Sequence, residues 1–530
     1  MIVELRLVMM MVTPSNSSSP VIISAAQFTE RLESPSFAAL SPADITAKAA
    51  QAAIDNALPR PQRAGLVAAI DTLMAVRTFE DSAPVFVSPF GRSNNMPASI
   101  AKRLGLSADH LIWGTSGGDT PQHLVAEACQ RIELGQSQAV LVCGGEAIAT
   151  ARYLVKQGIS ADWSESLDSP VDDRGADFSM LSPQELAHGL TTPALFHGLI
   201  ENARRASEGW SMTQWQQYMG ELMGSFCEVA SRNPYSAVEQ PVWSCDEIVT
   251  PSDRNRMIAH PFTQRLMAKD RVNQSAAVVI VSEALANSFE VPEQQRVYLR
   301  GYGTAGEPPV TERANIGSAP SAGYALKAAL LSANLDLADI NLFDFYSCFP
   351  VAVHNAISGI GVAATDPRGL TLTGGLPYFG GPGNNYSLHA IAEAVSRLQK
   401  QSGHALVAAN GGFLSKYAVG VYSTEPPTEP QQRFADVENG SGYNPDRVRV
   451  ASAPEGSGCI ETYTVDYQKD GTAKKAIIVG VLETSGERFI ACTQRGDIET
   501  VRTIATTNAI GLRVHVTSDE QQSLFTIEID

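Results

Sequence analysis

The stretch Asp344-Phe345-Tyr346-Ser347-Cys348-Phe349-Pro350 joins a predicted buried strand to a predicted helix of small and β-branched residues. The first turn of a helix presents unpaired N–H groups and a positive dipole end, which favour a thiolate, phenolate or enolate beside them. Tyr346, Ser347 and Cys348 are therefore candidate reactive groups. The alternative is that Cys348 is a small buried hydrophobe and Tyr346 a packed ring with a satisfied hydroxyl.

Length and composition predict a globular protein with two or three folding units. The chain has 530 residues, of which 44% are hydrophobic and 18% charged, with a formal net charge of −17. A chain of this length is too long for one ordinary core. The negative charge argues against nucleic acid or an anionic membrane as the main partner.

The cysteines and the hydropathy pattern predict a cytoplasmic protein without a membrane span. Seven cysteines are widely scattered with no C-x-x-C pair, which indicates neither a disulfide framework nor a zinc site, and we expect no bound metal. No apolar run approaches the roughly 20 residues that span a bilayer. The apolar start of the chain is interrupted by Glu4 and Arg6 and lacks a cleavage-like site, so we expect a disordered leader over residues 1–20.

Strand and helix patterns alternate from Val21 onward and predict a layered α/β sheet. Strands are expected at 21–27, 65–74, 110–115 and 139–142, with helices starting near Ser41 and Asp119. The pattern repeats at an offset of roughly 270 residues: 297–303 resembles 21–27, and 405–412 resembles 139–145. Duplication of one α/β unit explains this repeat.

The predicted domain layout follows from these patterns and from shifts in composition. The first half covers residues 21–150 and 260–295, and the second half covers 296–425. Residues 151–259 carry four of the five tryptophans and are expected to form an inserted loop or cap region. A Pro-rich linker over 426–447 precedes short alternating strands at 448–530, which predict a small β-barrel.

Several separated motifs have the order and spacing of the thiolase superfamily over roughly residues 21–425. They are Ser116–Gln122, the turn at 142–146, Asn273–Ala277, Asp344–Pro350, the glycine-rich turn Phe379–Asn385, and Asn410-Gly411-Gly412 with Lys416 and Gly420. With the C-terminal segment included, the chain resembles the bacterial thiolase-like proteins, type 1. The resemblance implies a duplicated thiolase fold, layered α/β/α/β/α, with an inserted loop domain and an OB-like barrel.

The departures from the thiolase pattern limit the function that the resemblance implies. Gly118 stands where thiolases carry their nucleophilic Cys, and Gly380-Gly381-Pro382 matches the loop that supplies their catalytic His. Their late acid/base Cys matches Ala409. Cys348 alone occupies a matching catalytic position, that of the Cys in the His-Asp-Cys-Phe motif of sterol-carrier-linked thiolases.

The resemblance implies a pocket for CoA or an acyl-CoA thioester between the two halves, as substrate or ligand and without a tightly bound cofactor. The expected catalytic residues are Cys348, Tyr346 and His389, with His354 as a second candidate for the lost loop His. The expected substrate-binding residues are Ser116, Gly118, Gly380, Gly381, Asn384, Asn385, Asn410, Gly411 and Gly412. Glycine turns let backbone N–H groups approach a carbonyl oxygen, although tight strand–helix packing alone would also demand them.

Three functions remain open from the sequence. The first is an acyltransferase of the thiolase type with Cys348 as acid/base, acting on acyl-CoA. The second is a retro-aldolase on β-hydroxyacyl-CoA, because thiolase-like steroid aldolases lack the nucleophilic Cys, use tyrosines and work with an OB-containing partner. The third is a protein that only binds acyl-CoA. The resemblance implies a homodimer formed through a sheet edge, whereas an added domain covering that edge would leave a monomer.

Overall fold

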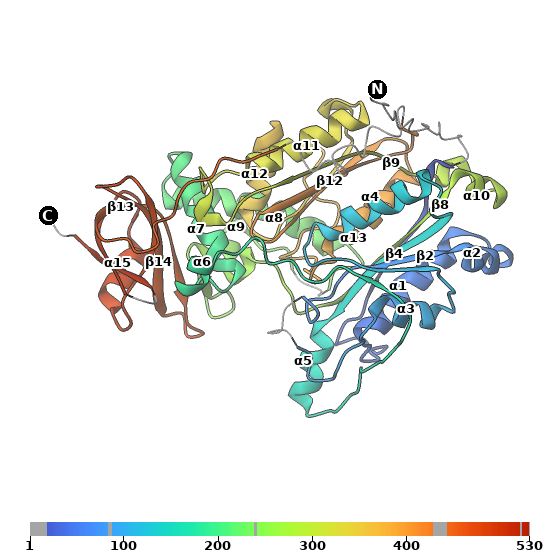
Figure 1. The fold of residues 1–530 in the computed structure, drawn as a ribbon, viewed down its shortest axis with the longest axis horizontal. Coiled ribbons are helices and arrows are strands. Elements are labelled where there is room, and N and C mark those ends of the chain that lie inside the picture. Colours follow the sequence, from blue (N-terminus) through green and yellow to red (C-terminus); the bar gives the residue numbers. More distant parts are fainter. Residues whose placement is uncertain (1–17, 83–86, 238–240, 428–442, 520–521, 529–530) are drawn as a thin grey trace, which may run out of the picture.

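The computed structural model describes residues 18–82, 87–237, 241–427, 443–519 and 522–528 (Figure 1). The predicted leader lies almost wholly outside these residues, as does most of the predicted linker. Within the described ranges, no helix is both long and apolar enough to cross a membrane.

The first α/β half contains a six-stranded sheet, over the described residues, with strand order β1-β8-β4-β2-β3-β5. Its strands are β1 (Pro20–Thr29), β2 (Thr72–Ala75), β3 (His110–Trp113), β4 (Ala139–Ala147), β5 (Asp172–Asp173) and β8 (Asn273–Ser282). Its helices are α1 (Pro42–Ala57), α2 (Arg63–Ala69), α3 (Met96–Leu104), α4 (Thr120–Glu133), α5 (Ile148–Gln157) and α10 (Glu283–Ser288).

The second half repeats the first and confirms the predicted duplication. Its sheet has the order β10-β11-β12-β9, and its strands are β9 (Tyr298–Gly306), β10 (Leu342–Phe345), β11 (His404–Gly411) and β12 (Lys416–Ser423). Its helices are α11 (Pro320–Ala333), α12 (Pro350–Ile360) and α13 (Tyr386–Leu398). Counted from β1 in the first sheet and from β9 in the second, the first two neighbouring strand pairs are antiparallel and the third pair is parallel.

Helices α4 and α13 lie between the two sheets and contact strands of both. A continuous apolar core joins these two helices to β4, β8, β11 and β12. Helix α1 covers the outer face of the first sheet, and α11 covers that of the second. This is the α/β/α/β/α layering that the resemblance implied, and it brings the N-terminus of α4 close to the carboxyl end of β11.

The strand expected at 65–74 is wrong for its first part. Residues Arg63–Ala69 form helix α2, and the strand β2 starts only at Thr72. Leu66 is the one buried side chain of α2. A short apolar run allows either structure, and the tight pairing of β2 between β3 and β4 fixes where the strand begins.

After β5, the inserted region and the residues up to Thr263 carry, where the structure describes them, mostly helices and two short strands. They are α6 (Pro183–Ala187), α7 (Pro193–Ser207), α8 (Met212–Arg232), α9 (Cys245–Val249), β6 (Met257–Ala259) and β7 (Phe262–Thr263). Helices α7 and α8 contact α12. The insertion therefore packs against the turn that the sequence singled out.

The C-terminal segment forms a closed five-stranded β-barrel, as predicted. Its elements are β13 (Gly456–Tyr467), β14 (Ala473–Leu482), β15 (Arg488–Cys492), α15 (Ile498–Thr506), β16 (Arg513–Ser518) and β17 (Ser523–Ile527). Pairing of β13 with β14 closes the barrel, and β6 of the insertion pairs with β13 from outside. Figure 1 shows the barrel at one end of the molecule, beside α6 and α7.

Candidate active site

The turn between β10 and α12 is fixed by Asp344 and Ser347. Asp344 Oδ2 accepts hydrogen bonds from the N–H groups of Leu372 (2.8 Å) and Thr373 (3.2 Å). Burial raises the pKa of Asp344 to about 6 in spite of these donors. Ser347 Oγ accepts from Leu376 N at 3.2 Å. These two side chains hold the neighbouring loop, so Tyr346 and Cys348 remain as the groups available for chemistry.

The hydroxyl of Tyr346 lies where a side chain at position 118 would extend. A Cβ built on Gly118 would collide with Tyr346 Oη and would lie 2.5 Å from the carbonyl oxygen of Asn410. The Tyr346 ring packs edge-to-face against Tyr386, with ring centroids 5.3 Å apart. A phenol therefore takes the space of the missing nucleophile.

Cys348 forms a pair with His197, a residue of α7 that the sequence analysis did not identify. Cys348 Sγ lies 3.6 Å from His197 Nε2. His197 Nδ1 lies 2.7 Å from the Pro193 carbonyl oxygen and must donate to it, which leaves Nε2 as an acceptor for the thiol proton. The imidazole also stacks on Phe349, with centroids 4.1 Å apart.

Both members of this pair are neutral at neutral pH. Burial raises the pKa of the Cys348 thiol to about 12. Burial, together with the nearby charge of Arg313, lowers the pKa of His197 to about 3. A neutral thiol and imidazole can pass a proton, but they do not form a standing thiolate nucleophile.

The first-turn N–H groups of α12 are not all free, contrary to the expectation from the sequence. Glu201, one turn after His197 on α7, accepts from Val351 N at 2.9 Å and from Trp215 Nε1 at 2.8 Å. Burial raises the pKa of Glu201 to about 8. The sequence contained one signal for this part of the site. Pro193 opens a helix, and His197 and Glu201 follow it four residues apart, on one face of that helix.

Three polar groups around this turn have no hydrogen-bond partner among the described residues. One, the hydroxyl of Tyr417, is a fully buried atom. The other two, the hydroxyl of Tyr346 and the side-chain amide of Asn410, belong to residues that are 8% and 3% exposed. Burial raises the pKa of both phenols above the usual value, so both stay protonated and can donate. Because buried polar groups are normally paired, these donors are suited to hold a ligand oxygen.

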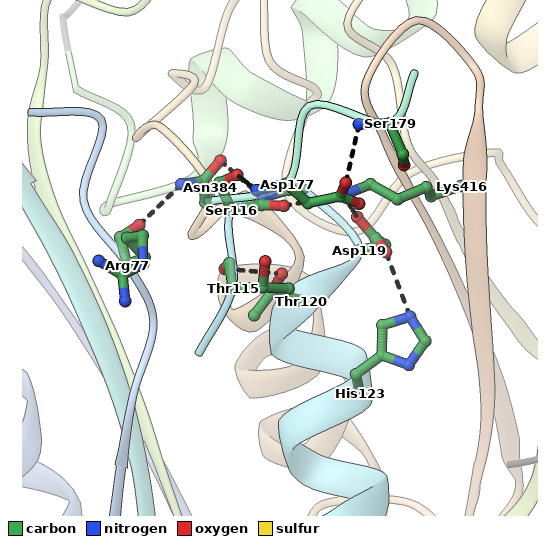
Figure 2. A network of polar contacts seen from close by, with 12 residues as sticks. Arg77, Thr115, Ser116, Asp119, Thr120, His123, Asp177, Ser179, Asn384 and Lys416 are labelled. Atoms are coloured by element: carbon green, nitrogen blue, oxygen red, sulfur yellow. Dashed lines mark hydrogen bonds and ion pairs between the residues drawn. The ribbon is translucent and has the colours of Figure 1, made fainter. Parts of the chain in front are cut away.

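The N-terminus of α4, in contrast, is closed by a polar network (Figure 2). Lys416 Nζ donates to the carbonyl oxygen of Ser116 (2.8 Å) and to Asp177 Oδ2 (3.1 Å). Ser116 Oγ accepts from Asp177 N at 3.0 Å. Asp119 binds His123 at 3.1 Å, and its other oxygen lies 4.0 Å from Lys416 Nζ. Ser116 therefore takes part in this network, and its predicted role in substrate binding stays a prediction.

The predicted residues Asn384 and Asn385 join the two halves. Asn384 accepts from Gly117 N (3.1 Å) and donates to the Arg77 carbonyl oxygen (2.8 Å). Asn385 donates to the Gly144 carbonyl oxygen at 2.8 Å. Both side chains are buried. Their contacts are structural, and the Oδ1 atom of Asn385 is left without a partner among the described residues.

The glycine turns bring backbone close to buried side chains. Gly380 has φ +129°, and a Cβ there would collide with Gln274; a Cβ on Gly411 would collide with Asp119. Gly381 N donates to the Lys269 carbonyl oxygen at 2.8 Å, and Gly412 has φ +64°. Close packing by itself accounts for Gly380 and Gly411, so their predicted role in substrate binding stays a prediction.

The two candidate histidines lie away from Tyr346 and Cys348. His389 is fully buried, contacts Gln27 Oε1 through Nδ1 at 2.9 Å, and has a pKa lowered to about 3 by burial. A chain of ring contacts through Phe379 and Tyr386 separates it from Tyr346. His354 binds the Tyr218 hydroxyl at 2.6 Å on the outer side of α12. His197 is the histidine that meets Cys348.

A cavity of about 500 Å³ lies beside the α4 network, lined by Asp119, His123 and Lys416 among others. Two pairs of its charged side chains are Lys416 with Asp177 and Arg174 with Glu127. In the described part of the chain, no cluster of three or more His, Cys, Asp or Glu side chains is suited to a metal ion.

Comparison with known proteins identifies the family. A crystal structure of a monomeric SCP2-thiolase-like protein type 1 from Mycobacterium smegmatis is 36% identical, covering 97% of this chain and 99% of that one, with a TM-score of 0.80. The chain belongs to the SCP2-thiolase-like proteins of type 1. The family model "Thiolase-like protein type 1 additional C-terminal domain" matches residues 444–521, which is the barrel of this SCP2-thiolase-like protein.

More distant structures share the fold of this SCP2-thiolase-like protein. The dimeric peroxisomal thiolase of Saccharomyces cerevisiae is 14% identical, covering 77% of this chain and 98% of that one, with a TM-score of 0.55. The Ltp2-ChsH2(DUF35) aldolase is 17% identical over the same shares, with a TM-score of 0.54. The search of curated proteins found no match.

Proposed function

We propose that this protein binds a coenzyme A thioester between its two halves and breaks or forms a carbon–carbon bond beside the thioester without an acyl-enzyme. The observation that carries the proposal is the Tyr346 hydroxyl above Gly118, where a thiolase has its nucleophile. A phenol that stays protonated is a proton donor and not a nucleophile. Chemistry at this point therefore runs through proton transfer.

Aldol cleavage is the reaction that needs these groups and no others. A base removes the hydroxyl proton of a β-hydroxyacyl thioester, the Cα–Cβ bond breaks, and its electron pair forms the thioester enolate. A proton then returns to Cα, giving a carbonyl compound and a shorter acyl thioester. Tyr346 and the Cys348–His197 pair supply the two proton-transfer positions, and the unpaired donors at Tyr417 and Asn410 suit the enolate oxygen.

The Cys348–His197 contact supports a second candidate, C-acyl transfer of the thiolase type with Cys348 as acid/base. That reaction has to proceed without an acyl-enzyme, because position 118 offers no thiol. The enolate of one acyl-CoA attacks the thioester carbonyl of a second, a carbon–carbon bond forms, the carbon–sulfur bond breaks, and CoA thiolate leaves. Binding of acyl-CoA without turnover is the third outcome that the experiments distinguish.

The test is calorimetry followed by turnover measurements. We expect CoA or acyl-CoA to give measurable heat, and β-hydroxyacyl-CoA to be cleaved where β-ketoacyl-CoA with free CoA is not. Cleavage of only the β-ketoacyl substrate selects C-acyl transfer, and heat without turnover selects a binding protein. No heat with CoA, acetyl-CoA or longer esters at millimolar concentration would contradict the proposal itself.

A further inference from the structure

Helix α7 has two occupied faces, and only one of them belongs to the site. One face presents His197 to Cys348 and Glu201 to the start of α12. The other face lies along the barrel strand β13, a relation visible in Figure 1. Every residue of α7 from Ala194 to Asn202 is buried as a result.

Side chains of β13 and α7 bond to one another's backbone. Thr462 Oγ1 donates to the Leu199 carbonyl oxygen at 2.6 Å. Asn202 Nδ2 donates to the Tyr463 carbonyl oxygen at 2.9 Å. The Leu199 carbonyl oxygen lies in the middle of α7, where a carbonyl already accepts the N–H group four residues later. The Thr462 hydroxyl is a second donor to this oxygen, and it fixes the position of α7 relative to β13.

Gly198, the residue after His197, is the point of closest approach. A Cβ there would collide with Thr464 Oγ1 and would lie 2.5 Å from the His260 carbonyl oxygen. His260 is itself tied to the barrel, since its N–H donates to the Val465 carbonyl oxygen at 2.9 Å. No side chain fits between α7 and β13 at this position.

A second barrel residue holds the segment that carries Arg313. Arg488 of β15 donates to the carbonyl oxygens of Thr311 (3.2 Å) and Arg313 and is paired with Glu461 at 2.7 Å. Arg313 is fully buried and its charge acts on His197. The barrel therefore contacts both the helix that bears His197 and the backbone of the segment that carries Arg313.

We propose that the C-terminal barrel is a positioning element of the active site, in which β13 sets the position of α7 and thereby the distance between His197 and Cys348. Barrel residues touch neither Cys348 nor the imidazole in the contacts described above, so they act through α7. The inference rests on the Cys348–His197 pair of the proposed function. It assigns a role to the domain that distinguishes this family from thiolases.

The test uses the full chain and the alkylation rate of Cys348 with iodoacetamide, followed by peptide mass mapping. In this reaction the sulfur bonds to the reagent carbon, iodide leaves, and the thiol proton goes to His197. Cys348 is partly exposed, and the partly exposed Cys459 serves as an internal reference. His197→Asn should slow Cys348 by roughly 10-fold or more, because a positioned base contributes about 10²–10⁴-fold.

Gly198→Ala should slow Cys348 to a similar extent, because its methyl group forces α7 away from β13. The matched control is Gly224→Ala in α8, where a Cβ meets nothing within 4 Å, and which should leave the rate unchanged. If Gly198→Ala fails to fold, Thr462→Val removes only the bond to Leu199 and should still slow Cys348, while Cys459 keeps its rate.

A folded Gly198→Ala or Thr462→Val protein with the wild-type Cys348 rate would overturn the positioning role. A wild-type rate in His197→Asn would overturn the pair and the inference together. The assay contains no CoA thioester. A protein that shows the expected rates but binds no thioester would contradict the proposed function and leave the positioning role standing.

Discussion

Two turns meet at the interface of the halves, and they differ in how their polar groups are satisfied. At the N-terminus of α4, Ser116, Asp119 and Lys416 are engaged with each other or with His123 and Asp177. The exception is Asp119 Oδ1, which has only the charge of Lys416 Nζ at 4.0 Å beside it. At the β10–α12 turn, the part of the chain that the structure describes offers the Tyr346 hydroxyl no partner and offers the Cys348 thiol a weak one at 3.6 Å. The first turn holds the two halves together, and the second keeps groups available for a ligand.

This difference indicates which of the two turns can still take part in a reaction when the nucleophilic Cys is absent. Hydrogen-bonded charges around Gly118 have become part of the fold, so they cannot change partners without a loss of stability. Among the described residues the buried Tyr417 hydroxyl lacks a partner, and no hydrogen bond involves the hydroxyl of Tyr346, so a bound oxygen would satisfy both donors. The following five predictions test this contrast.

Removal of the Tyr346 hydroxyl should have the largest effect. On a β-hydroxyacyl-CoA substrate, Tyr346→Phe should lower kcat/KM by roughly 10²–10⁴-fold, the usual contribution of a general acid or base. Cys348→Ala should cost less. The remote Tyr153→Phe, on α5, is the control and should keep full activity. A greater loss in Cys348→Ala than in Tyr346→Phe would identify C-acyl transfer instead.

Disruption of the closed turn should cost stability. Burial alone would raise the pKa of Asp119, but the hydrogen bond from His123 and the charge of Lys416 outweigh it and hold that pKa below its usual value. Lys416→Met should therefore lower the free energy of unfolding by about 2–3 kcal/mol at pH 7, somewhat less than for a fully buried pair.

The same variant has a defined pH dependence. A lowered carboxyl pKa contributes stability above the unfolded value near 4, and this contribution is lost as pH falls through the lowered pKa. The gap between wild type and Lys416→Met in urea unfolding should shrink between pH 5 and pH 2. Lys474→Met removes an exposed pair with Asp466 and should cost under about 1 kcal/mol; an equal loss in both variants would contradict the network's role.

Reinstating a thiol at position 118 should meet resistance from Tyr346. Gly118→Cys should destabilise the protein by about 1–2 kcal/mol in chemical denaturation, because its Cβ collides with the Tyr346 hydroxyl. Adding Tyr346→Ala to that variant should recover part of the loss. If Gly118→Cys is as stable as wild type, the phenol does not fill the nucleophile's space.

The last prediction is that the mass of the protein does not change on incubation with an acyl-CoA. Intact mass after incubation with acetyl-CoA or acetoacetyl-CoA should show no added acetyl group, because no thiol lies at position 118 and the pKa of Cys348 is raised to about 12. A stoichiometric adduct mapped to Cys348 would make that residue the nucleophile.

The duplicated fold could be predicted because each half carries its own periodic signals. Segments such as 139–145 and 405–412 are short apolar runs that end in glycine turns, and burial in a sheet leaves few other residue types for them. The C-terminal β-barrel could be predicted for a similar reason, because its short alternating strands are visible in the sequence. The exception, at 65–74, is a run too short for its period to separate helix from strand.

Only the site residues that lie next to one another in the sequence could be predicted. Tyr346 and Cys348 follow a strand end, a signal contained within seven residues. Cys348 and His197 are 151 positions apart, and nothing in the local sequence of the insertion says which histidine faces the turn. Glu201 was missed for the same reason. Pairings of this kind are set by how α7 packs on α12 and β13, which periodicity does not encode.

The pairing of β6 with β13 has a consequence for synthesis on the ribosome. His260 is made long before Val465, to which its N–H group bonds. At roughly 5–20 residues per second, about 10–40 s pass between the two. During that interval one side of α7, including Leu199, has no strand to cover it. The thiolase-like part therefore emerges with an apolar surface that only the last domain can close.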